Sequence, residues 1–149
     1  MADLLECLIQ IKGVADTPRR LAARVRGAVA VGRQEVASTV VSRMVAAEGR
    51  FAACLDGMLA GPTPALPSLD LASLENDPGR SLGDSMQDFA WRRAQVVRRL
   101  ETCSAEELNR VGFEPSRGPM TVADLVAVML AHDTDQLGLL VLPGTDAGR

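Results

Sequence analysis

The chain has 149 residues, 47% hydrophobic and 23% charged, which is the balance of one globular domain. Its formal net charge of −3 gives no general attraction to nucleic acid or to an anionic membrane. Its only aromatic residues are three phenylalanines, one tryptophan and one histidine, so few rings could stack on bases. We therefore expect a single domain over residues 1–149 that binds neither nucleic acid nor membrane.

The cysteines predict the cellular compartment. Cys7, Cys54 and Cys103 stand far apart, and an odd number without paired spacing argues against a disulfide framework or a cysteine zinc site. The acidic N-terminus lacks the basic segment and apolar run of a signal peptide. No apolar run reaches the roughly 18 residues that would cross a membrane. We expect a protein of the reducing cytoplasm.

Two long helices are predicted in the first half of the chain. The first runs from about Asp3 to Arg26, and the second from about Gln34 to Leu59. Pro18 lies inside the first helix and lacks a backbone N–H, so we expect a kink or short break there, with Thr17 capping the restarted helix. The apolar face of the first helix is predicted to comprise Leu4, Leu8, Ile11, Ala15, Leu21 and Val25, widened by Leu5 and Ile9.

A long crossover follows, from Gly61 toward Asp77-Pro78-Gly79. Its prolines are incompatible with a helix or a central strand, but its leucines can pack, so we expect it to be ordered. A third long helix is predicted over Leu82–Thr102, followed by a short helix over Ser104–Arg110 that a capping box opens. Gly112–Met120 is predicted to be a loop, since it carries no hairpin signal. The last helix is predicted from Thr121 to about Leu142, and the tail after it is expected to fray.

These elements predict an all-α fold. Four amphipathic segments of this kind are typical of a four-helix bundle. The long crossover between the second and third helices would let those two run parallel.

The only histidine, His132, is the first candidate for chemistry. It follows apolar residues of the last helix, so its side chain is expected to be at least partly buried, and Gln136 lies one turn further on the same side. A single histidine on a helix is more often a packed residue than a ligand, since transition-metal sites need several converging ligands.

Arg43 is the second candidate. Its spacing among the apolar residues of the second helix predicts that it points inward. It would then either extend to the bundle end with its stem packed, or be a buried guanidinium that needs a carboxylate. Asp133, Asp135 and Glu48 are the possible partners, although Asp135 is more simply a solvated helix charge.

The third helix carries two further features. The pairs Arg92-Arg93 and Arg98-Arg99 form a basic strip, and such strips are usually solvated. Trp91 falls off the apolar stripe and could mark an interface. No phosphate-binding glycine loop and no serine nucleophile elbow occurs.

Several segments together resemble the DinB/YfiT-like family. They cover most of the chain, and the last helix is the most specific of them. The segments are Thr17–Leu21, Val40–Phe51, Phe89–Arg93 with Leu100 and Glu107-Leu108, Thr121–Leu125 and Ala131–Asp133. The resemblance implies a four-helix bundle that often dimerises, so a homodimer is expected.

The resemblance also implies a metal site, which this sequence alters. Typical members hold nickel or zinc with three histidines, and some are thiol S-transferases or maleylpyruvate isomerases. Carried over residue by residue, the three ligand positions fall on Arg43, His132 and Gln136, so one histidine remains. Arginine brings a permanent charge and no lone pair, and glutamine offers a weak amide oxygen.

Two main functions follow from these residues. The first is a metal-free binding or interaction protein that takes a small anion in a pocket of Arg43, Glu48, His132, Asp133 and Gln136. The alternative is a transferase resembling thiol S-transferases, with nickel or zinc on an altered ligand set such as His132 with Glu48 or Asp133. A third possibility is a metal-free enzyme with His132 as general base. Whether the protein is an enzyme stays open.

Overall fold

A computed structural model describes residues 3–62, 64–74 and 80–141. Its elements in chain order are α1 (Leu4–Ala30), α2 (Gln34–Ala60), the 3₁₀ turn η1 (Leu71–Ser73), α3 (Leu82–Glu101), α4 (Ala105–Leu108), β1 (Val111–Glu114), β2 (Gly118–Thr121) and α5 (Val122–Gly138). None of the described helices is long and apolar enough to cross a membrane.

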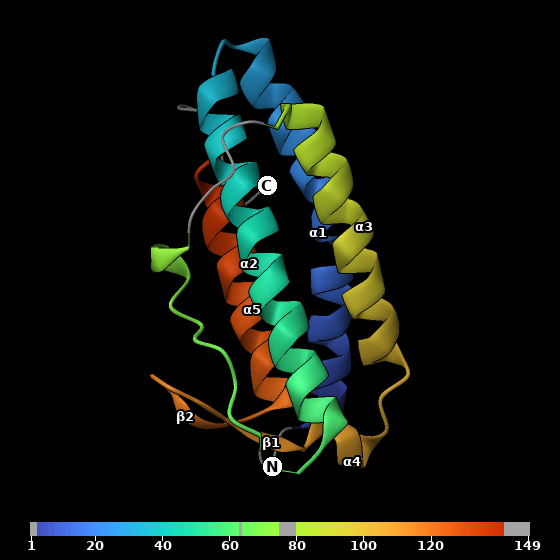
Figure 1. Ribbon diagram of the computed structural model, residues 1–149. Coiled ribbons are helices and arrows are strands. Elements are labelled where there is room, and N and C mark those ends of the chain that lie inside the picture. The colour runs from blue at the N-terminus through green and yellow to red at the C-terminus, as the bar shows by residue number, and fades with distance from the viewer. Residues whose placement is uncertain (1–2, 63, 75–79, 142–149) are drawn as a thin grey trace.

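The four long helices form the predicted bundle. In Figure 1, α1 rises from the N-terminal end, α2 and α3 both descend, and α5 rises again. The crossover therefore makes α2 and α3 parallel, as its length predicts. Its leucines do pack, since Leu66 and Leu69 are both buried.

The predicted break at Pro18 is wrong, because α1 is one continuous helix through this residue. Thr17 is not a cap. It lies in the middle of the helix with its side chain fully buried. The lost backbone hydrogen bond is compensated from another helix, as described below.

The buried face of α1 is also rotated from the predicted one. Leu5 is 65% exposed and Ile9 is 60% exposed, and Leu4 and Leu8 are exposed as well. The side chains that face the bundle are Cys7, Ile11, Val14, Thr17, Leu21, Val25 and Ala28. This series keeps a regular three- and four-residue spacing over the whole helix, whereas the N-terminal leucines share a second, shorter stripe.

The segment predicted as a loop after α4 is a small antiparallel hairpin. Val111 pairs with Thr121 and Glu114 with Gly118. Gly118 has φ of 75°, the left-handed conformation that glycine adopts most easily. A glycine at the end of a three-residue turn is a hairpin signal, and the hairpin could have been predicted from it.

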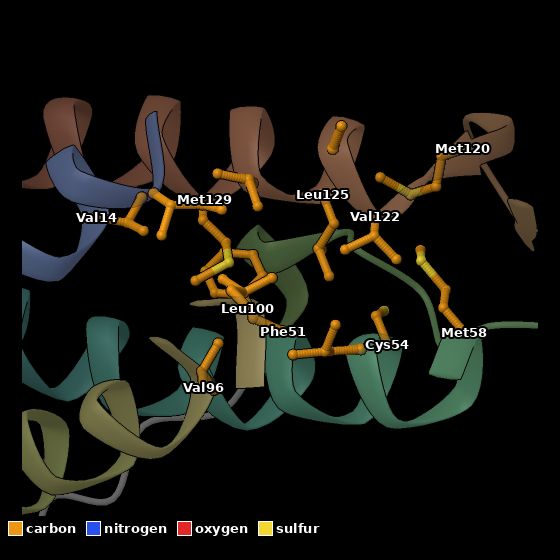
Figure 2. Close-up of a cluster of buried hydrophobic side chains, with 14 of the residues drawn as sticks. Val14, Phe51, Cys54, Met58, Val96, Leu100, Met120, Val122, Leu125 and Met129 are labelled. Carbon is orange, nitrogen blue, oxygen red and sulfur yellow. The ribbon is translucent and has the colours of Figure 1, made fainter. Parts of the chain in front are cut away.

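The apolar core consists of two clusters. The hairpin-end cluster includes Val14, Phe51, Val96, Leu125 and Met129 and is drawn in Figure 2, where side chains of all four long helices converge. The loop-end cluster lies toward the α1–α2 connection and comprises Leu21, Val25, Ala28, Ala37, Val40, Val41, Met44, Phe89, Leu137 and Leu140. The boundary between the two clusters positions the polar residues of the candidate site.

Candidate functional site

A polar layer crosses the middle of the bundle, with one residue from each long helix. It consists of Thr17 from α1, Glu48 from α2, Arg93 from α3 and Asp133 from α5, each at most 1% exposed. On α1, α3 and α5 it separates the two apolar clusters, with Val14 and Leu21, Val96 and Phe89, and Met129 and Leu137 on either side. On α2 the boundary falls one residue earlier, because Ala47, next to Glu48, belongs to the hairpin-end cluster and Met44 to the loop-end cluster.

Arg93 is the centre of this layer. Its Nε and Nη2 donate to the two carboxylate oxygens of Glu48, both at 2.8 Å. Its Nη1 and Nη2 donate to Asp133 at 2.6 and 3.0 Å, and Nη1 also donates to the Val14 carbonyl at 2.9 Å. These bonds use all five N–H donors of a guanidinium. Thr17 Oγ1 completes the layer by donating to Asp133 at 2.6 Å.

The bond to Val14 explains why Pro18 does not break α1. In a helix the carbonyl of Val14 would accept from the N–H of residue 18, and proline has none. A buried carbonyl without a partner is costly, and Arg93 supplies the missing donor. The arginine of α3 therefore compensates for the proline of α1.

The layer holds two carboxylates and one guanidinium. Burial raises the pKa of Glu48, and the nearby charge of Asp133 adds to this effect, while Arg93 opposes it. One guanidinium balances only one of the two negative charges, so the second carboxylate makes the ionisation of Glu48 less favourable. The aromatic ring of Phe89 lies against the guanidinium, with 4.9 Å from Cζ to the ring centroid.

His132 and Gln136 lie beside this layer on α5. The imidazole of His132 is half-buried and meets the ring of Phe51 edge to face, with centroids 5.7 Å apart. Burial lowers the pKa of His132, the charge of Asp133 opposes this effect, and the charge of Arg93 adds to it. The Oε1 atom of Gln136 is buried and has no hydrogen-bond partner among the described residues.

Arg43 does not point inward, and this expectation is wrong. The residue is exposed, and no hydrogen bond or ion pair involves it within the described ranges. Val41 and Glu48 belong to the buried face of α2, which leaves Arg43 at its edge with its long side chain in solvent. Arg43 instead lines an open groove between α2 and the end of α5.

The structure thus divides the five residues of the predicted pocket. Glu48 and Asp133 meet around Arg93, His132 and Gln136 lie together on α5, and Arg43 lines the groove. Asp135 is a solvated charge, as expected.

The residue that sequence reasoning missed is Arg93. It was assigned to a solvated strip, but only Arg92 and Arg98 of that strip are exposed while Arg99 is half-buried. Arg93 falls four residues after Phe89 and three before Val96, on the apolar stripe of α3. That spacing was the signal for a buried guanidinium. Trp91 is 66% exposed, which confirms its predicted exposure.

The metal-binding residue types are not grouped in the described part of the chain. No set of three or more histidine, cysteine, aspartate or glutamate side chains is placed there to hold a metal ion. All three cysteine thiols are free.

Comparison with known proteins agrees with this architecture. The profile of the DinB superfamily matches residues 14–140, while no curated protein sequence matches the chain. A solved structure, YfiT from Bacillus subtilis, superposes with a TM-score of 0.80 and 13% sequence identity over 94% of this chain and 86% of that one. YfiT is described as a probable metal-dependent hydrolase with an unusual four-helix bundle topology. The profile match spans most of the sequence and includes all four long helices, and the chain belongs to the DinB superfamily.

Proposed function

We propose that this DinB-superfamily protein binds a small anionic ligand and does not use a divalent metal. The observation that carries the proposal is the complete engagement of Glu48 and Asp133 by Arg93. These two carboxylates are the oxygen ligands that an altered metal site would need. A cation would have to displace a buried guanidinium that makes five hydrogen bonds.

The other ligand positions point in the same direction. Arg43 has no lone pair to donate and carries a permanent positive charge that repels a cation. It also lies exposed and without a partner in the described structure, where it could meet an anion from solvent. The donor set therefore does not fit the three-histidine site that the family resemblance implies.

A metal-dependent transferase remains the alternative, and one observation favours it. The pKa of His132 is lowered by burial, which favours the neutral imidazole with a lone pair on one ring nitrogen, and Gln136 Oε1 is buried without a partner among the described residues one turn further on. These two atoms could hold a metal weakly, with solvent supplying the remaining ligands. The structurally similar YfiT is described as a probable metal-dependent hydrolase, which also supports this alternative.

Two measurements on purified protein test the proposal together. The first is metal content after incubation with nickel, zinc and manganese, compared with a His132→Ala variant. The second is the shift in melting temperature with a panel of phosphate, sulfate and carboxylates. We expect no stoichiometric metal in either protein, and stabilisation by an anion that an Arg43→Gln variant loses. Stoichiometric metal that His132→Ala loses would support the alternative and overturn the proposal.

We also propose that the protein is cytoplasmic, as its unpaired cysteines predict, and that it is a homodimer, as the family resemblance implies. Exposed apolar side chains support association, since Leu5, Ile9 and Trp91 are each at least 60% exposed. Light scattering on a size-exclusion column would give twice the chain mass for a dimer, and the chain mass at micromolar concentration would contradict it.

A further inference from the structure

The groove that Arg43 lines has both a charged edge and an apolar surface. It lies between the N-terminal half of α2 and the last residues of α5 and has a volume of about 440 Å³. This is within the size range of small-molecule sites. Val36, Val40 and Leu139 give it an apolar surface, and Val36 and Leu139 are themselves exposed to solvent.

The charges around the groove limit the ligand it can accept. Arg33, Arg43 and Glu35 all line it, which leaves one net positive charge. The guanidinium of Arg33 is already directed to the end of α5, where it donates to the carbonyls of Val141 and Leu139 at 3.4 and 3.5 Å. Arg43 has no such partner in the described structure, so its planar fork of donors is available.

Arg33 also gives the groove a fixed wall. Its bonds connect the start of α2 to the end of α5, whose last turn contains no basic residue of its own. The two walls of the groove therefore hold their separation through a residue that lines the groove. A ligand would meet Arg43 and the apolar wall without first ordering these helix ends.

We propose that this groove binds monocarboxylates that carry a compact apolar body. The carboxylate accepts two parallel hydrogen bonds from Arg43, and the apolar body packs on Val36 and Leu139. A single positive charge matches one carboxylate better than a dianionic phosphate, because Glu35 would repel the second negative charge. This inference rests on the proposed function and names the class of anion.

The test uses NMR titration of the labelled full-length protein with four probes. The probes separate the contribution of the negative charge from that of the apolar body. Benzoate has the charge and the apolar body, benzamide has the body alone, acetate has the charge alone, and phenyl phosphate carries a second charge at pH 7.5. The variants are Arg43→Gln and, as a matched control, Arg26→Gln, which removes an exposed arginine of α1 outside the groove.

We expect benzoate to shift amide signals of Val40 and Leu139 and to bind about tenfold or more tightly than benzamide or acetate. Arg43→Gln should weaken benzoate by about tenfold and leave benzamide unchanged, while Arg26→Gln should bind benzoate as the wild type does. Equal binding of benzoate and benzamide, equal loss in both variants, or no shift at the groove would overturn the inference.

Two outcomes separate this inference from the proposed function. If phenyl phosphate binds more tightly than benzoate and requires Arg43, the monocarboxylate assignment is wrong while an anion-binding protein remains. If the protein instead takes up stoichiometric metal through His132, the proposed function itself fails.

Discussion

At the scale of single residues, Arg93 determines how the candidate site is organised. Its fork of donors satisfies two carboxylates and a carbonyl at once, which the ammonium of a lysine could not do with the same geometry. The carboxylates are thereby held inside the bundle. Among the residues of the predicted pocket, Arg43 therefore supplies the positive charge that solvent and ligands can reach.

The excess negative charge of the polar layer predicts a pH dependence of stability. The folded protein raises the pKa of Glu48 through burial, so its contribution to stability is full below its unfolded pKa, about 4.3, and is lost as pH rises through the folded value. A Glu48→Gln variant does not lose stability in this way, because its amide does not ionise as the pH rises. Its stability relative to wild type should therefore improve as the pH rises from 4 to 8.

Urea unfolding at several pH values measures this difference. The amide costs one hydrogen bond to Arg93 at every pH, so the trend with pH is the informative quantity. Glu106→Gln removes an exposed carboxylate of α4 and serves as the control for a change in net charge. A Glu48→Gln difference that stays constant with pH, or falls, would contradict the charge assignment.

At this scale the sequence offers a buried guanidinium at Arg43 as one of two alternatives, with Asp133, Asp135 or Glu48 as its partner. The structure has the buried guanidinium at Arg93, with Glu48 and Asp133 as partners. The two arginines differ in their position on the apolar stripe. Arg93 replaces a core residue between Phe89 and Val96, whereas Arg43 stands at the edge of the buried face of α2. Periodicity locates an arginine on a helix face to within about one residue, and a long side chain at the edge can reach solvent.

At the scale of elements, the hairpin and the crossover are built as one unit. The carboxylate of Glu114 is buried and accepts hydrogen bonds from the N–H of Leu69 at 2.8 Å and of Arg117 at 2.6 Å, and from Ser116. Burial opposes its charge, but these donors hold the pKa of Glu114 below its usual value. Leu66 pairs with Phe113 through its backbone N–H, so the crossover is attached at two points.

The crossover and the hairpin are also in close steric contact, and this contact gives a testable prediction. A Cβ on Gly112 would lie 2.7 Å from Cδ1 of Leu66, so the buried leucine must move. We expect Gly112→Ala to destabilise the protein by about 1–3 kcal/mol, the usual cost of overpacking. Gly83→Ala in the first turn of α3 meets no atom within 4 Å and should be neutral or stabilise by up to about 1 kcal/mol.

Thermal or urea unfolding of the two alanine variants measures this contrast. A similar effect of both substitutions would mean that Leu66 adapts without cost, and would contradict the close packing of crossover and hairpin. Hydrogen exchange at the Leu69 amide would show whether the loss is local to the crossover.

Element boundaries were largely predictable where a side chain caps a helix. Ser104 begins α4 with the predicted capping box, and Thr121 begins α5 with a capping box that it forms with Asp124. The strands of the hairpin are only four residues long, too short for a period-two pattern to stand out, so the turn glycine Gly118 was its available signal. Pro18 was misjudged because its compensating donor comes from α3, which is distant in sequence.

At the scale of the whole molecule, the bundle and its parallel α2–α3 pair followed from four amphipathic segments and one long crossover. The register of the four helices could not be predicted in the same way. The polar layer fixes it, because Arg93 meets Glu48 and Asp133 in only one alignment of α2, α3 and α5. Such long-range pairing is invisible to local periodicity.

Removing one charged residue of the layer and removing all three are expected to have different effects on the free energy of unfolding. Arg93→Met leaves Glu48 and the Val14 carbonyl without a donor and leaves Asp133 with Thr17 as its donor, and should cost about 3–5 kcal/mol. A combined variant with Glu48→Leu, Arg93→Met and Asp133→Leu replaces the whole ion cluster with apolar volume. We expect it to recover most of that loss, since buried ion clusters often contribute little net stability.

Urea unfolding of both variants, with Arg92→Met as the exposed neighbour control, measures this contrast. The control loses only the partly exposed pair with Asp88 and should cost about 0.5 kcal/mol. If the combined variant is as unstable as Arg93→Met, the layer stabilises the fold outright. If it is stable but shows broadened NMR signals, the layer aligns the helices without adding net stability. The ionic contacts would then select one helix register among several that an apolar core permits.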